Sequence, residues 1–403
     1  MNPSDQPSSS SPLPGGFRYS GTACGLKASG RKDLSLVVAD HAVVAAGVYT
    51  QNQIVAAPVI NCRSKTPSRS IRAVVTNSGN ANACTGEQGQ HDANKMCELV
   101  ADVLDCDPSQ VLVMSTGVIG VPLAMEEISK GIHAANLELN QTTEDFQHAA
   151  DAICTTDQSR KTASRQFDVD GKTVHITGMA KGAGMIAPNM ATMLALITTD
   201  ASLSEEEAEA CLKTACKESF NRISVDGHTS TNDTVILLAS GDSKVAIGKS
   251  SLEIFQRALN SLFTELAKLI VADGEGATHV MAIEIIGAVN DDQAFEIAKT
   301  VAASPLVKTA ITGGDPNWGR IVSAAGYAQA EITPDAATLK ICGETIYQNG
   351  TPLPFDAATL SQKMKANVEV PIQLRVGLGN GHSNYWSSDL TTDYVRFNSE
   401  YTT

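Results

Sequence analysis

The sequence KGAGMIAPNMATMLALITTD, residues 181–200, joins a glycine-rich loop to an apolar run that begins at Thr192. The loop contains Lys181 but lacks the Gly-x-x-x-x-Gly-Lys-Ser/Thr order of a phosphate-binding loop, so nucleotide binding is not supported. The apolar run has the length and the β-branched residues of a buried strand. Taken alone, Thr192 is therefore a residue that opens a strand.

Apolar runs and amphipathic stretches alternate on both sides of this segment, from Gly16 onward. Runs that are apolar throughout are typical of strands covered on both faces: residues 71–77, 110–117 and 234–241. Apolar residues spaced three and four apart predict helices: residues 89–104, 204–218, 251–270 and 292–302. Ser204 and Glu207 have the spacing of a capping box. The alternation predicts an α/β fold of layered sheets covered by helices.

The composition excludes several classes of protein. A net charge of -14 without a cluster of Lys and Arg argues against nucleic-acid binding, because phosphate neutralisation needs a concentrated basic surface. The sequence contains no apolar run near the ~18 residues that span a bilayer, so no membrane association is expected. These features favour a protein that acts on small polar metabolites.

The cysteines and the N-terminal residues indicate the cellular compartment in which the protein is expected. Nine cysteines, an odd number without a C-x-x-C pair, suit neither a disulfide framework nor a structural zinc site, and they indicate reduced thiols in a cytoplasm. Residues 1–15, rich in Ser and Pro, lack the basic start and the apolar stretch of a secretory signal. We expect them to form a flexible tail.

Several motifs together resemble those of the ornithine acetyltransferase (ArgJ) family. The segment KGAGMIAPNMATML resembles the self-cleavage segment of that family, and further motifs follow in the same order along nearly the whole chain. They are AGVYTQNQIVAAPV (46–59), TNSGNANACTG (76–86), VMSTGVIG (113–120), SVDGHTSTNDTV (224–235), DGEGATH (273–279), GDPNWGRI (314–321) and YVRFNSEYTT (394–403). The resemblance implies a self-processing fold like that of ArgJ and the aminopeptidase DmpA.

The resemblance implies that the chain cuts itself between Ala191 and Thr192. The products would be an α chain, residues 16–191 after the tail, and a β chain, residues 192–403. Cleavage by attack of the Thr192 hydroxyl on the Ala191 carbonyl leaves a free α-amine beside that hydroxyl. With a reference pKa of roughly 7.7 to 8.0, the amine can take the hydroxyl proton near neutral pH. Nucleophile and base then belong to one residue.

Further site residues follow from the matching motifs. Thr116, through its hydroxyl, and Gly117, through its backbone N–H, would form the oxyanion hole. The implied substrate-binding residues are Thr155, Lys181, Thr192, Glu275, Asn398 and Thr403. By charge complementarity, Lys181 would pair with the substrate carboxylate and Glu275 with the ornithine ammonium. Taken singly, these two would be solvated charges, Thr155 a helix-end residue, and Asn398 and Thr403 parts of a frayed terminus.

The implied activity is a ping-pong transfer of the acetyl group from N2-acetylornithine to glutamate through an acetyl-threonine enzyme, in arginine biosynthesis. The resemblance implies no cofactor and no metal, and it leaves open whether acetyl-CoA is a second donor. It also implies a cytoplasmic heterotetramer of two α and two β chains.

Some residues depart from the family pattern. TTDQSRK, residues 155–161, lacks the proline that the family carries before its lysine, and His228 stands where relatives carry Asp. A lone loop histidine is more often solvated than catalytic, so His228 is not assigned to the site. GDPNWGRI has turn chemistry, and we expect it to scaffold the site.

Two other functions fit parts of the pattern. A self-processing aminopeptidase of related fold would pass the acyl group to water, although that family typically uses serine where this chain has Thr192. A binding protein for acetylated amino acids would keep the pocket without cutting the chain. Acetyl transfer measured against acetate release separates the first alternative, and a denaturing gel separates the second.

Overall fold

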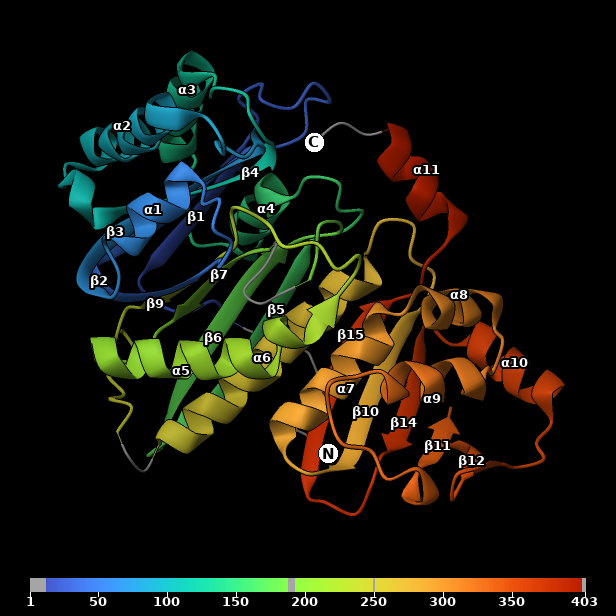
Figure 1. Ribbon diagram of the computed structural model, residues 1–403. Coiled ribbons are helices and arrows are strands. Elements are labelled where there is room, and N and C mark those ends of the chain that lie inside the picture. The colour runs from blue at the N-terminus through green and yellow to red at the C-terminus, as the bar shows by residue number, and fades with distance from the viewer. Residues whose placement is uncertain (1–11, 188–192, 249–250, 401–403) are drawn as a thin grey trace. The chain divides into compact units, whose positions relative to one another are not determined.

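The computed structural model describes residues 12–187, 193–248 and 251–400, and the chain divides into two compact units (Figure 1). Unit 1 comprises Met1–Asn221, His228–Ile270 and Thr402–Thr403, and unit 2 comprises Arg222–Gly227 and Val271–Tyr401. The division differs from the predicted cut into residues 16–191 and 192–403. That cut therefore falls inside unit 1.

Unit 1 contains strands and helices in alternation. Its strands are β1 (Phe17–Thr22), β2 (Leu34–Tyr49), β3 (Ser68–Asn80), β4 (Val111–Val118), β5 (Lys161–Val169), β6 (Lys172–Lys181), β7 (Leu194–Thr199) and β9 (Thr234–Ala239). Its helices are α1 (Ala57–Arg63), α2 (Gly86–Leu104), α3 (Met125–Leu137), α4 (Thr143–Ile153), α5 (Glu205–Glu218) and α6 (Leu252–Ala272), whose last two residues belong to unit 2.

Among the described residues, unit 1 forms an eight-stranded sheet in the order β4-β3-β2-β9-β7-β6-β5, with β1 also paired to β2. The long strand β2 pairs with β3 along both of its halves, from Leu34 to Ala45. Its other partner changes midway, because Leu34–Ala39 pair with β1 whereas Val44–Tyr49 pair with β9. The Tyr19 hydroxyl on β1 lies 2.9 Å from Thr198 Oγ1 on β7. A side-chain hydrogen bond therefore joins β1 and β7, two strands that are not paired with each other.

Strand β7 lies in the interior of this sheet, antiparallel to β6 and parallel to β9. All six of its residues are buried, as expected for a strand covered on both faces. Helix α6 packs on β6, where a Cβ on Gly178 would lie 3.0 Å from the Leu262 side chain. The predicted α and β chains therefore contribute neighbouring strands to one sheet.

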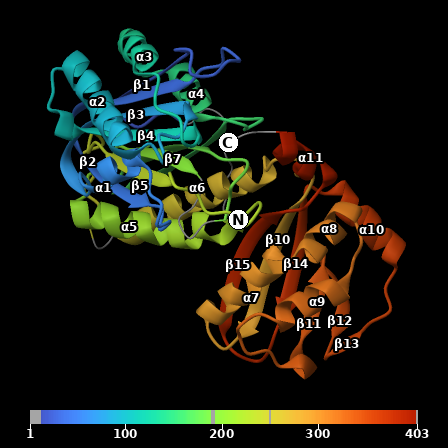
Figure 2. The same cartoon turned by 45° about the horizontal axis from the view of Figure 1, so that its top comes forward.

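Unit 2 is a second α/β layer structure (Figure 2). Its strands are β8 (Ile223–Ser224), β10 (Val280–Ala288), β11 (Thr338–Ile341), β12 (Glu344–Gln348), β13 (Thr351–Pro352), β14 (Glu369–Arg375) and β15 (Gly381–Ser388). Its helices are α7 (Asp291–Ala303), α8 (Pro305–Gly313), α9 (Trp318–Gly326), α10 (Ala357–Ala366) and α11 (Thr392–Glu400). The described strands form one sheet, in the order β13-β12-β11-β14-β10-β15-β8. One face of it supplies Ile283, Ile285 and Ile372 to a core shared with α7 and α9.

The fold predicted from the sequence is confirmed as α/β, with layered sheets covered by helices. The predicted strands correspond to β3, β4 and β9, and the predicted helices to α2, α5, α6 and α7. The capping box is present, because Glu207 N donates to Ser204 Oγ at 3.1 Å and Ser204 N donates to Glu207 Oε2 at 2.9 Å. Within the described residues, no helix is long and apolar enough to cross a membrane.

The predicted tail, residues 1–15, is described only from residue 12 onward. In that part Pro14 is buried, and the Gly15 carbonyl oxygen accepts a hydrogen bond from Ser240 Oγ at 2.8 Å. Residues 14 and 15 thus contact the body of unit 1.

Candidate active site

The predicted oxyanion pair lies at the end of β4, beside β3. Gly117 has φ +135°, and a Cβ at this position would lie 2.2 Å from the Gly79 carbonyl carbon and 2.4 Å from Asn80 N. No side chain fits there, which explains why the sequence has glycine. Ser115 Oγ donates to Asn77 Oδ1 at 2.6 Å and fixes the strand before the pair.

Lys181 ends β6 and contacts the oxyanion pair. Its side chain is 4% exposed, and its Nζ donates a hydrogen bond to Thr116 Oγ1 at 3.2 Å. On the neighbouring strand, its register partner is Leu194. The structure thus places two of the predicted residues, Lys181 and Thr116, within hydrogen-bond distance of each other.

Ala191 and Thr192, which carry the predicted cleavage and nucleophile, lie outside the described residues, as does Thr403. Met193 follows Thr192 and lies within the described residues, and its carbonyl oxygen accepts a hydrogen bond from Thr234 N at 3.1 Å. The residue that follows the predicted nucleophile is therefore attached to the start of β9.

Asp157, which the sequence analysis did not select, connects Thr155 to the loop after β6. Its Oδ1 accepts hydrogen bonds from Lys161 Nζ at 2.6 Å and Gly182 N at 2.7 Å, and its Oδ2 accepts one from Thr155 N at 2.8 Å. Burial alone would raise the pKa of this carboxyl, but the charges of Lys181 and Lys161 hold it well below its usual range. Thr155 is therefore held by a buried carboxylate.

Two further cations lie around Thr155. Lys27 Nζ donates to the carbonyl oxygens of Lys32 at 2.7 Å and Cys154 at 2.6 Å, and an Arg31 guanidinium nitrogen lies 3.4 Å from the Thr155 carbonyl oxygen. Burial lowers the pKa of Lys27 to about 8, and the positive charge of Arg31 acts in the same direction. In a chain of net charge -14, this cationic loop suits an anionic group such as a carboxylate.

Asn232 and Asp233 connect β9 to the candidate site, and the sequence analysis selected neither. Asn232 Nδ2 donates to the carbonyl oxygens of Ala81 at 2.6 Å and Ser115 at 2.8 Å. Asp233 Oδ1 accepts a hydrogen bond from Met193 N at 2.8 Å. These two side chains fix the residue before Thr116 and the residue after Thr192.

In unit 2, the predicted residues Glu275 and Asn398 contact each other. Asn398 Nδ2 donates to Glu275 Oε2 at 3.1 Å, from helix α11 to the loop that precedes β10. Gly276, at φ +67°, packs so closely that a Cβ would lie 2.4 Å from Tyr394 N. The Thr391 hydroxyl donates to the Gly276 carbonyl oxygen at 2.7 Å. The C-terminal segment is therefore ordered as a helix through residue 400, and it packs on the loop of residues 273–279 that precedes β10.

His228 and the GDPNWGRI motif lie in loops and turns. His228 is exposed. In GDPNWGRI, Gly314 caps α8 at φ +63°, the Asn317 side chain accepts from Arg320 N at the start of α9, and Trp318 stacks on Tyr347 with ring centroids 5.3 Å apart. This motif therefore builds the turn between two helices of unit 2.

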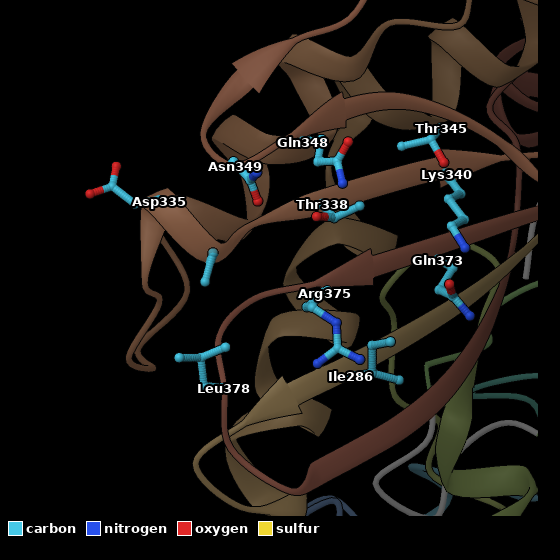
Figure 3. Close-up of a pocket in the computed structure, with 11 residues that line it drawn as sticks. Ile286, Asp335, Thr338, Lys340, Thr345, Gln348, Asn349, Gln373, Arg375 and Leu378 are labelled. Atoms are coloured by element: carbon cyan, nitrogen blue, oxygen red, sulfur yellow. The ribbon is translucent and has the colours of Figure 1, made fainter.

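A groove of about 700 Å³ lies on the sheet of unit 2, lined by strand residues such as Thr338, Lys340, Gln373 and Arg375 (Figure 3). It contains none of the predicted site residues. Across residues 12–187, 193–248 and 251–400, no three His, Cys, Asp or Glu side chains are grouped to hold a metal ion.

Comparisons with known proteins agree with the resemblance seen in the motifs. The ArgJ family profile matches residues 18–403. The chain is 56% identical over 405 residues to the arginine biosynthesis bifunctional protein ArgJ of Rhodopirellula baltica, covering 100% of this chain and 99% of that protein. It is 43% identical to the protein of the same name from Gloeobacter violaceus, covering 96% of each.

One solved structure resembles part of the fold. The crystal structure of the arginine biosynthesis bifunctional protein argJ from Bacillus halodurans has a TM-score of 0.51 and 39% sequence identity. The match covers 52% of this chain and 100% of that chain.

Proposed function

This chain belongs to the ArgJ family, and from that premise we propose that it transfers the acetyl group of N2-acetylornithine to glutamate in arginine biosynthesis. The observation that carries the proposal is the hydrogen bond from Lys181 to Thr116, made by a lysine whose register partner is Leu194. The hydrogen bond joins β4, which carries Thr116 and Gly117, to β6. Strand β6 pairs in turn with β7, and these two strands come before and after the Ala191–Thr192 bond in the sequence.

The proposed reaction begins with self-cleavage. The Thr192 hydroxyl attacks the Ala191 carbonyl carbon, the amide becomes an ester, and water hydrolyses the ester. The negative charge that develops on the carbonyl oxygen is received by the Thr116 hydroxyl and the Gly117 N–H, each typically worth ~3 kcal/mol of barrier. Lys181, hydrogen-bonded to Thr116, orients that hydroxyl and adds a positive charge.

Acetyl transfer then uses the same groups. The free amine of Thr192 takes the hydroxyl proton, the hydroxyl oxygen attacks the acetyl carbonyl, and ornithine leaves with the proton. Glutamate attacks the acetyl-threonine and carries the acetyl group away. Because one amide replaces a similar amide, exclusion of water from the ester matters more than driving force.

Substrate recognition follows charge. In unit 1, the cationic loop of Lys27 and Arg31, together with Lys181, is proposed to receive carboxylates. In unit 2, Glu275 is proposed to receive the ornithine ammonium. The Asn398 side chain would hold the Glu275 carboxylate in place through its hydrogen bond.

The assembly is proposed to be a heterotetramer of two α and two β chains, and light scattering that returned a single αβ pair would contradict it. We propose a cytoplasmic location, supported by the nine cysteines, which are all free thiols in the described part of the chain.

The function is tested with purified protein. A denaturing gel with mass spectrometry should show two fragments, the second beginning at Thr192. Acetylation of glutamate should be measured with N2-acetylornithine and, separately, with acetyl-CoA, which decides whether acetyl-CoA is a donor. Release of acetate at the expense of acetylglutamate would instead identify an amidohydrolase, and an uncut chain that binds acetylated amino acids would identify a binding protein.

A further inference from the structure

The loop between β1 and β2 is held by one buried carboxylate. Asp33 is 0% exposed, and its two oxygens accept hydrogen bonds from the backbone N–H groups of Cys24 at 2.7 Å, Gly25 at 3.2 Å, Leu26 at 2.7 Å and Lys27 at 3.0 Å. The loop is also attached to β3, because Ser78 N donates to the Asp33 carbonyl oxygen at 2.8 Å. These bonds fix the backbone from which the Lys27 side chain extends.

The Lys27 side chain lies beside the predicted oxyanion pair. A Cβ on Gly79 would lie 3.4 Å from Lys27 Cγ, so the lysine stem packs on the end of β3. Gly79 is the register partner of Gly117, and a Cβ on Gly117 would lie 2.2 Å from the Gly79 carbonyl carbon. Lys181 contacts the same pair, because its Nζ donates to Thr116 Oγ1 at 3.2 Å. Lysines from two separate segments therefore lie close to this pair.

The Lys27 ammonium group has a donor that the protein does not use. A lysine ammonium carries three N–H donors. Lys27 Nζ gives one to the Lys32 carbonyl oxygen at 2.7 Å and one to the Cys154 carbonyl oxygen at 2.6 Å. Within the described residues the third N–H has no acceptor, and Lys27 forms no ion pair. The third N–H is therefore available to a ligand.

The side chains around this ammonium leave an excess of positive charge. Arg31 donates to a backbone carbonyl oxygen and Lys181 to a hydroxyl, and neither forms an ion pair in the part of the chain that the structure describes. Two carboxylates also belong to this cluster. Asp33 is engaged by backbone N–H groups, and Asp157 pairs with Lys161 at 2.6 Å. Four cations thus face two carboxylates, which favours an anionic ligand.

The surroundings of Lys27 shift its pKa. Burial lowers it to about 8, and the positive charges of Arg31, in the same loop, and Lys181, on β6, act in the same direction. Cys154, after α4, and Asp33 act in the opposite direction. A carboxylate bound beside the ammonium would stabilise its charged form. Lys27 is therefore suited to a ligand that carries negative charge.

The two substrates of the proposed transfer differ in their side chains. Both carry an α-carboxylate, for which Lys181 is proposed. N2-acetylornithine also carries an ammonium, for which Glu275 is proposed, whereas glutamate carries a second carboxylate. Glu275 would repel that carboxylate, because like charges placed together cost binding free energy. Glutamate therefore needs a separate cation, and the unused N–H of Lys27 meets this need.

We propose that Lys27 selects glutamate as the acceptor by donating its third N–H to the side-chain carboxylate of glutamate. Arg31 adds a second positive charge from the same loop. The inference rests on the proposed function, and it adds the contact that distinguishes the acceptor from the donor.

The test compares glutamate with glutamine as acceptors, because their side chains differ in charge and hardly in size. With N2-acetylornithine as donor, wild-type kcat/KM should be higher for glutamate. Lys27→Met keeps an unbranched side chain and removes the charge. We expect its kcat/KM for glutamate to fall about 10- to 100-fold, as for a lost hydrogen bond to a charged group, and its kcat/KM for glutamine to change less than about twofold.

A third acceptor separates selection from a merely structural role. Acetyl exchange from N2-acetylornithine to isotopically labelled ornithine uses the same transfer steps, but this acceptor has no side-chain carboxylate. Lys27→Met should therefore exchange the label at the wild-type rate, measured by mass spectrometry. A lysine that only supports the fold would instead slow transfer to all three acceptors.

Lys32→Met is the matched control. Lys32 belongs to the same loop, and its Nζ donates to the Gly21 carbonyl oxygen at 2.6 Å. The substitution removes the same charge and the same kind of hydrogen bond, but one directed at β1. It should keep the wild-type ratio of kcat/KM for glutamate to kcat/KM for glutamine.

The wild type offers a test that does not depend on the folding of a variant. The pH dependence of kcat/KM reports the ionisation of the free enzyme, in which the pKa of Lys27 is about 8. The ratio of kcat/KM for glutamate to kcat/KM for glutamine should be highest below that pH. It should fall as the pH rises through about 8, because the ammonium becomes neutral.

Three results would overturn the assignment of Lys27. The first is a folded Lys27→Met variant with the wild-type ratio, and the second is one that loses transfer to glutamate, glutamine and ornithine alike. The third is a wild-type ratio that stays constant as the pH rises from about 7 to about 9. Failure of the proposed function is distinguishable, because the wild type itself would then transfer acetyl to none of these acceptors.

Discussion

Lys181 Nζ donates a hydrogen bond to Thr116 Oγ1 at 3.2 Å, although 65 residues separate the two in the sequence. Their strands, β6 and β4, lie near opposite ends of the sheet order. The strands β3, β2, β9 and β7 stand between them in that order. A lysine and a threonine on distant strands thereby become one polar pair.

Lys181→Met should raise KM for N2-acetylornithine about 10- to 100-fold, because a hydrogen bond to a charged group is worth roughly 1.5–3 kcal/mol. Steady-state kinetics with varied donor measures the change. Lys130→Met is the control, since Lys130 pairs with Glu126 on the exposed face of α3. Equal KM values for Lys181→Met and wild type would exclude Lys181 from substrate binding.

Thr192→Ala should abolish both processing and transfer, because one hydroxyl serves both reactions, whereas Thr192→Ser should keep part of each. A denaturing gel and the transfer assay measure the two activities. An alanine variant that still separates into fragments of the expected masses would show that another group cuts the chain.

Gly117→Ala should lower the free energy of unfolding by more than ~2 kcal/mol and remove transfer. The new Cβ would meet the backbone of Gly79 at 2.2 Å, on a residue at φ +135°. Gly120→Ala is the control, because Gly120 also has a positive φ but open space around it, so about 1 kcal/mol is expected. Urea denaturation compares them, and similar losses would disprove the close approach.

Asp157→Asn should lower the free energy of unfolding by about 3–5 kcal/mol at pH 7, because it leaves Lys161 buried without its counter-ion. Adding Lys161→Met should recover part of the loss, which a double-mutant cycle in urea measures. Two losses that simply add would show that the pair is not coupled.

The same carboxyl predicts a pH dependence of stability. The pKa of Asp157 is lower in the folded chain than in the unfolded chain, so its contribution is complete above about pH 4 and is lost as the pH falls towards the folded value. Wild-type stability should therefore fall more steeply below about pH 4 than that of Asp157→Asn. Parallel curves in acid titrations would contradict this.

Removal of residues 398–403 should raise KM or eliminate transfer while leaving self-cleavage largely intact. The reason is the hydrogen bond from Asn398 to Glu275, which attaches α11 to the loop of residues 273–279. Gel analysis and kinetics of the truncated chain measure both effects, with Asn398→Ala as the smaller change. Identical kinetics for truncated and full-length enzyme would remove the terminal residues from the site.

The local elements could be predicted because their signals are local. The apolar runs of β3, β4 and β9 and the Ser204–Glu207 capping box need only near neighbours in the sequence. The change of partner from β1 to β9 along β2 could not be predicted, because it depends on which strands compete for its two halves.

The candidate site was predicted only in part, for a similar reason. Thr116 and Lys181 came from motifs, and the structure places them in contact. Asp157 and Asp233 were missed because a carboxylate in a sequence looks the same whether it is solvated or buried. Their significance lies in burial and in the partners Lys161 and Met193, which only the folded chain brings to them.

The position of β7 between β6 and β9 has a consequence for reversibility. In a chain cut before β7, backbone hydrogen bonds still hold Leu194–Thr199 between β6 and β9, so the cut chain keeps its fold. Once melted, however, it must reassemble from two separate pieces, a bimolecular step that dilution slows. Heat inactivation of the mature enzyme should therefore be governed by the rate of unfolding. The stability of the mature enzyme is then described by a half-life at a given temperature, and not by an equilibrium free energy of unfolding.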